Sequence, residues 1–124
     1  MTTIHPVAGV RIGIASAGIK KVGRKDLVVF ELAEGSSTVA VFTRNAFCAA
    51  PVIVAKQNLA QTQPKYLLVN TGNANAGTGA PGIQATQATL AALAQVAGCA
   101  PRQILPFSTG VIGEPLPVAK IEAA

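Results

Sequence analysis

The chain has 124 residues and a mass of 12.5 kDa, which suits one domain or one part of a larger domain. Half of the residues are hydrophobic, only 4% are aromatic and only 12% are charged, which excludes intrinsic disorder. So few charges also predict that another structure covers much of the exterior. The net charge is +5, but the sequence lacks the long basic stripe and interleaved aromatic residues of a nucleic-acid-binding protein. No nucleic-acid partner is therefore expected.

Cysteine and histidine are too scarce for a disulfide framework or a metal site. The chain has two cysteines, Cys48 and Cys99, and one histidine, His5. We therefore expect reduced thiols and no metal. No cofactor is expected either. No segment reaches the ~18 apolar residues of a membrane span, and the first ten residues do not resemble a signal peptide. The sequence predicts a soluble, cytoplasmic protein with no membrane partner.

The N-terminal third of the chain predicts strands joined by polar turns. Residues Val10–Ala15 alternate between apolar and other residues, which indicates a strand. A glycine-punctuated turn over 18–25 follows. Residues Leu27–Leu32 form a nearly continuous apolar run, typical of a strand buried on both faces. After a reversal at 34–37, a second such strand is expected at 38–43, so the two strands predict a hairpin.

The turn over 18–25 carries four of the ten basic residues of the chain, Lys20, Lys21, Arg24 and Lys25. Such clusters are usually solvated turns, which is the interpretation we favour. Attraction of acidic metabolites is the alternative.

Helices and strands alternate in the rest of the chain. A helix is expected at 49–60, a strand at 66–69, a helix at 82–97 with Gly98 as its left-handed cap, and a strand at 104–107. Pro117 can open a last helix, which has no stop signal before the final residue. The pattern predicts an α/β fold and an element still running where the sequence stops.

A segment rich in glycine and asparagine follows the strand at 66–69. It begins at Asn70, ends at Gly79 and precedes a helix, an arrangement that can direct backbone N–H groups at an anion. Its spacing fits neither dinucleotide-binding nor Walker motifs. The asparagine side chains can instead bond their own backbone. A structural segment is therefore favoured over an anion-binding module.

The second candidate is Ser108-Thr109-Gly110, at the carboxyl end of the strand at 104–107, where open α/β sheets place working residues. A Thr followed by Gly can offer a hydroxyl and N–H groups to a developing oxyanion. An ordinary tight turn is the alternative, and geometry alone favours it. No His or Lys pairs convincingly with a nucleophile, so the chain could stabilise a transition state without launching the attack.

These segments resemble the amino-terminal part of the bifunctional ornithine acetyltransferase / N-acetylglutamate synthase family of arginine biosynthesis. The likeness covers nearly the whole chain in order. It is carried by GVR at 9–11, AGIK at 17–20, VFTRN at 41–45, AAPV at 49–52, NTGNANAGTG at 70–79 and STGVIGEPLP at 108–117. The last two motifs are long and specific.

The resemblance implies a layered fold related to N-terminal-nucleophile hydrolases, with residues 1–124 as a single partial domain, incomplete at its C-terminus, from the α chain. In this family a precursor cleaves itself, and the freed Thr takes acetyl from N2-acetylornithine and passes it to glutamate. Some members also accept acetyl-CoA. The family pattern assigns the oxyanion hole to the positions of Thr109 and Gly110.

The same resemblance implies what must lie outside the sequence. The nucleophilic Thr would belong to a β chain, so the expected partners are that chain and the remainder of the α chain in a hetero-oligomer. The segment 70–79 is expected to support the site structurally. The 124 residues alone are expected to be inactive.

Overall fold

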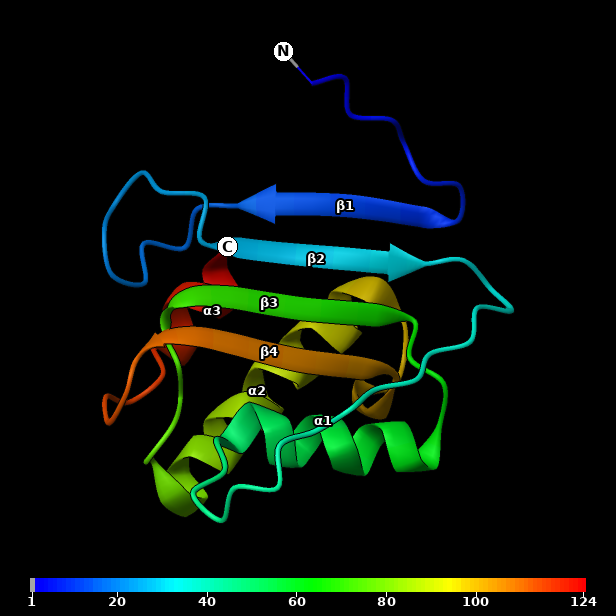
Figure 1. The fold of residues 1–124 in the computed structure, drawn as a ribbon. Helices are drawn as coiled ribbons and strands as arrows, with labels where there is room; N and C mark the ends of the chain where they lie inside the picture. Colours follow the sequence, from blue (N-terminus) through cyan, green and yellow to red (C-terminus); the bar gives the residue numbers. More distant parts are fainter. Residues whose placement is uncertain (1) are drawn as a thin grey trace.

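The computed structural model describes residues 2–124, which form a mixed sheet with helices packed on one face (Figure 1). The strands, in their order across the sheet, are β1 (Val10–Ala15), β2 (Leu27–Leu32), β3 (Tyr66–Asn73) and β4 (Ile104–Val111). Pairing is antiparallel from β1 to β3, and β3 and β4 are parallel. A parallel pair needs a crossover connection, and the longest helix of the structure supplies it. The α/β prediction is confirmed.

The helices begin and end close to the predicted positions. They are α1 (Ala50–Gln61), α2 (Gly79–Ala97), a 3₁₀ turn (Pro101–Gln103) and α3 (Val118–Ala123). Pro51 lies in the first turn of α1, where its missing N–H costs nothing. Gly98 ends α2 with φ 67°, the left-handed conformation predicted for it. None of the helices described in residues 2–124 is long and apolar enough to span a bilayer.

The core lies between the sheet and α2. Leu90 of α2 and Ile104 of β4 are almost fully buried, and each contributes roughly 1.5–3 kcal/mol by leaving water. Ile121 closes the end of the core from α3. The other buried members of this cluster are Ile19, Leu27, Val54, Leu68, Ala94 and Leu116.

The predicted hairpin of Leu27–Leu32 with 38–43 is wrong. Residues 38–43 form no strand; Val39 and Val41 are 94% and 99% exposed. The physical reason is that β1 and β3 already occupy both edges of β2, so no backbone groups remain for a further strand. The Thr38 N–H instead donates to the side chain of Gln63.

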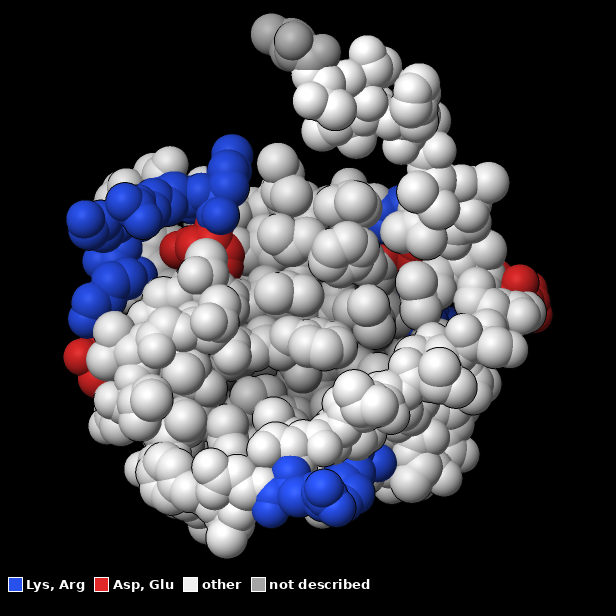
Figure 2. Space-filling model, in the orientation of Figure 1, with Lys and Arg blue, Asp and Glu red and all other residues white. Residues whose placement is uncertain are grey.

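One face of the sheet has no helix over it. Aligned partners on neighbouring strands share a face, so Ile14, Val28, Val69 and Phe107 form a row across this open face. Ile14 is 60% exposed and Phe107 44%. The strand β2 is therefore mostly half-buried, not buried on both faces as predicted. Figure 2 shows uncharged residues over the middle of the molecule, with Lys and Arg gathered near its edges.

Candidate active site

The structure places Thr109 and Gly110 near the carboxyl end of β4, beside β3. The sequence predicts a strand that stops at residue 107 and a loop after it, but β4 runs on to Val111. Because β3 also continues, Thr109 lies opposite Thr71 and Gly110 opposite Gly72. Thr109 is exposed and, two residues after Phe107, shares the open face with it.

Gly110 sits where two backbones come too close for any side chain. Its φ is 133°, which L-residues with a side chain rarely adopt. A Cβ there would overlap the carbonyl carbon of Gly72 and lie 2.6 Å from the nitrogen of Asn73. The register also shifts at Asn73, which pairs with both Thr109 and Val111. Such a bulge re-aims backbone groups at the end of a strand pair and is common beside active sites.

The three asparagines of the segment 70–79 are buried, and their side chains bond within the protein. Asn70 accepts a 2.5 Å hydrogen bond from the Ser108 hydroxyl. Asn75 donates to the Gly82 carbonyl at 3.0 Å and to the Thr86 hydroxyl at 2.8 Å. These internal bonds favour the structural interpretation of the segment over an anion-binding one.

Asp26 folds the basic turn against the end of β3. Its buried carboxylate accepts hydrogen bonds from the backbone N–H groups of Ala17 at 2.6 Å and Ile19 at 2.8 Å. Burial raises the pKa of Asp26, but these amide bonds outweigh it and the pKa is lowered overall. The turn then brings the Lys20 ammonium 3.4 Å from Glu114. Lys20 also lies beside Gly72, because a Cβ added to Gly72 would meet the Lys20 side chain at 3.1 Å.

We expect this carboxylate to make stability depend on pH. Because the pKa of Asp26 is lower in the folded state, its contribution is present above its unfolded pKa, near 4, and is lost as the pH falls through the folded pKa. At pH 7, Asp26→Asn should therefore lower the free energy of unfolding by about 1–2 kcal/mol. Urea titrations should show this deficit shrinking below pH 4. The exposed Glu34→Gln should show little deficit, and a pH-independent deficit for Asp26→Asn would contradict the assignment.

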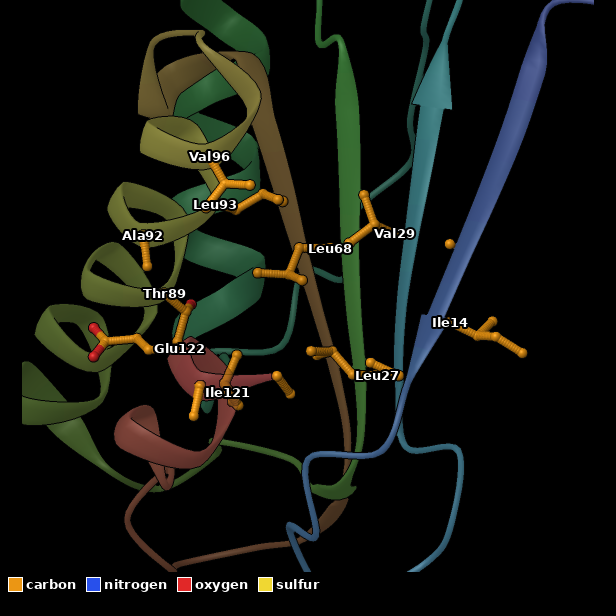
Figure 3. Close-up of a pocket in the computed structure, with 14 residues that line it drawn as sticks. Ile14, Leu27, Val29, Leu68, Thr89, Ala92, Leu93, Val96, Ile121 and Glu122 are labelled. Carbon is orange, nitrogen blue, oxygen red and sulfur yellow. The ribbon is translucent and has the colours of Figure 1, made fainter.

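A groove lined by residues of the sheet, α2 and α3 lies on the other side of the sheet from Thr109. Its volume is about 440 Å³, and it opens between the sheet and α2 (Figure 3). Leu27, Val29 and Leu68 line it from the sheet, facing Leu93 and Val96 of α2. Its lining is mostly apolar and includes neither Thr109 nor Gly110. The groove is therefore separate from the candidate residues Thr109 and Gly110.

The residues that could bind a metal lie apart. Within residues 2–124, no three His, Cys, Asp or Glu side chains gather as a metal site would require. Both cysteines are free and half-buried, and His5 is exposed. Burial raises the pKa of the Cys99 thiol and Lys65 partly opposes this, so the thiolate is disfavoured.

The sheet with its helices on one face defines an α/β fold, in which Thr109 and Gly110 lie beside Gly72 at the carboxyl ends of β3 and β4. The ArgJ family model matches residues 11–124 of this domain. The chain belongs to the ArgJ family.

Relatives and solved structures agree with this membership. The chain is 64% identical to the arginine biosynthesis bifunctional protein ArgJ of Pseudomonas fluorescens and 62% identical to that of Pseudomonas syringae pv. tomato. Both matches cover the whole chain but only 30% of the relative. Among solved structures, ArgJ of Bacillus halodurans matches with a TM-score of 0.87 and 32% identity over 94% of this chain and 61% of that one. Ornithine acetyltransferase of Mycobacterium tuberculosis, solved with ornithine, matches with a TM-score of 0.80 and 34% identity. This match covers 94% of this chain and 63% of that one.

One residue of the candidate site, Gly72, has a role that the sequence did not reveal. It belongs to a glycine-rich segment, but nothing local shows that it lies against Gly110 of another strand. The usable signal is that each glycine follows a Thr after a predicted strand. Aligning those two Thr-Gly pairs across the sheet would have placed the glycines side by side.

Proposed function

We propose that this chain supplies the oxyanion hole of an acetyltransferase in arginine biosynthesis. The reaction transfers acetyl from N2-acetylornithine to glutamate through an acetyl-threonine intermediate. The observation that supports this most directly is the exposed Thr109-Gly110 pair at a glycine–glycine contact, in a chain of the ArgJ family. The relatives' name, arginine biosynthesis bifunctional protein, and the ornithine complex of the Mycobacterium tuberculosis enzyme agree with this reaction.

For this reaction, Thr109 and Gly110 need only hold hydrogen-bond donors in fixed positions. Attack of a Thr hydroxyl on the acetyl carbonyl places negative charge on its oxygen in the tetrahedral intermediate. The Thr109 hydroxyl and the neighbouring backbone N–H groups would donate hydrogen bonds to that oxygen. Acyl transfer between a hydroxyl and amines needs no cofactor, and acetyl-CoA would enter only as an alternative acetyl donor.

The remaining parts of the site would come from other segments of the family protein. The chain spans about 30% of the length of the Pseudomonas relatives it matches. Thr109 lies on the same open face as the apolar row that contains Ile14 and Phe107. A partner that covers this row buries apolar surface and at the same time reaches Thr109. We propose that the rest of the α chain and the β chain with the nucleophilic Thr do both.

A chimeric enzyme tests this function. In it, the 124 residues replace the matching segment of the Pseudomonas fluorescens relative. With N2-acetylornithine and glutamate, the chimera should form ornithine at a rate within about tenfold of the relative's own, since a hundredfold loss is what removing one oxyanion donor costs. The isolated chain should form none. A folded chimera without activity, or an isolated chain with an enzyme-like rate, would contradict the proposal.

A further inference from the structure

The segment that carries the proposed oxyanion donors is held by β3 on both sides. Before it, the Ser108 hydroxyl donates to Asn70. After it, the Asn73 side chain donates to the carbonyls of Glu114 at 3.2 Å and Pro115 at 3.0 Å. The residues between these two points, 109–113, include Thr109 and Gly110.

Burial cannot fix this segment, because most of it is exposed. Thr109, Gly110 and Gly113 are exposed, and Ile112 is 65% exposed. Apolar contacts that hold the core therefore contribute little here. Its position depends on hydrogen bonds, including those of the Ala74 N–H to Val111 and the Gly113 N–H to Ala76, both 2.8 Å long.

Hydrogen bonds at both ends of its side-chain amide fix the conformation of Asn73. It is only 2% exposed, and its oxygen accepts the Asn75 N–H at 2.7 Å while its nitrogen serves the two carbonyls. Asn70 adds a bond from its nitrogen to the Asn73 carbonyl at 2.9 Å. The Asn73 side chain thus has a donor end and an acceptor end that are both used, so an amide is required there.

We propose that Asn73 is a positioning residue that holds Thr109 and Gly110 in the geometry an oxyanion needs. It acts through the carbonyls of Glu114 and Pro115 and makes no contact with substrate. Small displacements of such donors cost a large part of their effect, because the donors must be in place before charge develops. This inference rests on the proposed function for its catalytic meaning, but the positioning itself can be measured without catalysis.

Amide hydrogen exchange of the isolated 124-residue chain, followed by NMR, tests the positioning. Asn73→Asp keeps the acceptor for Asn75 but turns the donor into an oxygen facing two carbonyls. We expect exchange at the amides of Ala74 and Gly113 to speed up at least tenfold, and the amide shifts of Thr109 and Gly110 to move. The amides of Leu68 and Leu90 in the core should keep their rates.

The matched control is Asn58→Asp. Asn58 of α1 donates to the Ile104 carbonyl at 3.0 Å, at the opposite end of the same strand. Asn58→Asp should not change exchange at the amides of Ala74 and Gly113 relative to exchange in the core. If Asn73→Asp does not fold, Ser108→Ala takes its place. It removes the hydrogen bond to Asn70 at the other end of the segment and should speed up exchange at the same amides.

Two results would overturn the inference: unchanged exchange and shifts at these positions, or faster exchange that is equal there and in the core. In the chimeric enzyme, Asn73→Asp should lower kcat at least tenfold with a much smaller change in KM. A chimera without activity before substitution would refute the proposed function alone, because the exchange result does not depend on it.

Discussion

Gly110→Ala is expected to lower the free energy of unfolding by about 4 kcal/mol. Two effects add: a positive φ held by a residue with a side chain costs about 1–3 kcal/mol, and overpacking costs typically about 1–3 kcal/mol. The φ of 133° causes the strain, and the overlap of the new Cβ with the Gly72 backbone causes the overpacking. Backbone atoms of a paired strand cannot move aside as a flexible side chain can, so β3 and β4 would have to separate.

Urea denaturation at pH 7 measures this loss, and two other glycines separate its causes. Gly113 has φ 81° but no atom within 4 Å of a new Cβ, so Gly113→Ala should cost only about 1–2 kcal/mol of conformational strain. Gly13 in β1 also has free space and no positive φ, so Gly13→Ala should be neutral or stabilising. A loss for Gly110→Ala no greater than that for Gly113→Ala would mean that the two strands do not approach as described.

Most elements of the fold could be predicted because their signals are local. The apolar spacing of α2 and its glycine cap, and the proline in the first turn of α1, act within a few residues. The hairpin at 38–43 failed for a reason that is not local. Whether an apolar run joins a sheet depends on which strand edges are free, and β1 and β3 occupy both edges of β2.

The candidate site could be predicted by residue but not by geometry. Thr109 and Gly110 follow a strand and match a long family motif, which is enough to select them. Their setting inside an extended strand depends on β3, which continues beside them and supplies Gly72. Likewise, three buried asparagines suggest local turns, whereas Asn73 bonds the carbonyls of Glu114 and Pro115, about forty residues away. Contacts of this separation leave no periodicity in a single sequence.

Thr109→Ala in the chimeric enzyme is expected to slow acetyl transfer by about 10²-fold or more, as removal of one oxyanion donor does. The loss should appear in kcat, because the hydrogen bond from the hydroxyl becomes strong only when negative charge develops on the acetyl oxygen. Stability should change little, since Thr109 is exposed and its side chain does not pack in the core. Steady-state rates of ornithine formation, with unfolding measured in parallel, separate these two effects.

Two further variants decide whether the hydroxyl of Thr109 itself is responsible. Thr109→Ser keeps a hydroxyl and should restore most of the rate. Thr71→Ala removes the exposed threonine directly opposite on β3, on the same face, and should leave the rate within about threefold, as expected for an exposed group outside the oxyanion hole. Equal losses in Thr71→Ala and Thr109→Ala would point to disturbance of the strand pair rather than to a missing donor. An unchanged rate in Thr109→Ala would leave only backbone N–H groups as donors, because their positions do not depend on the hydroxyl.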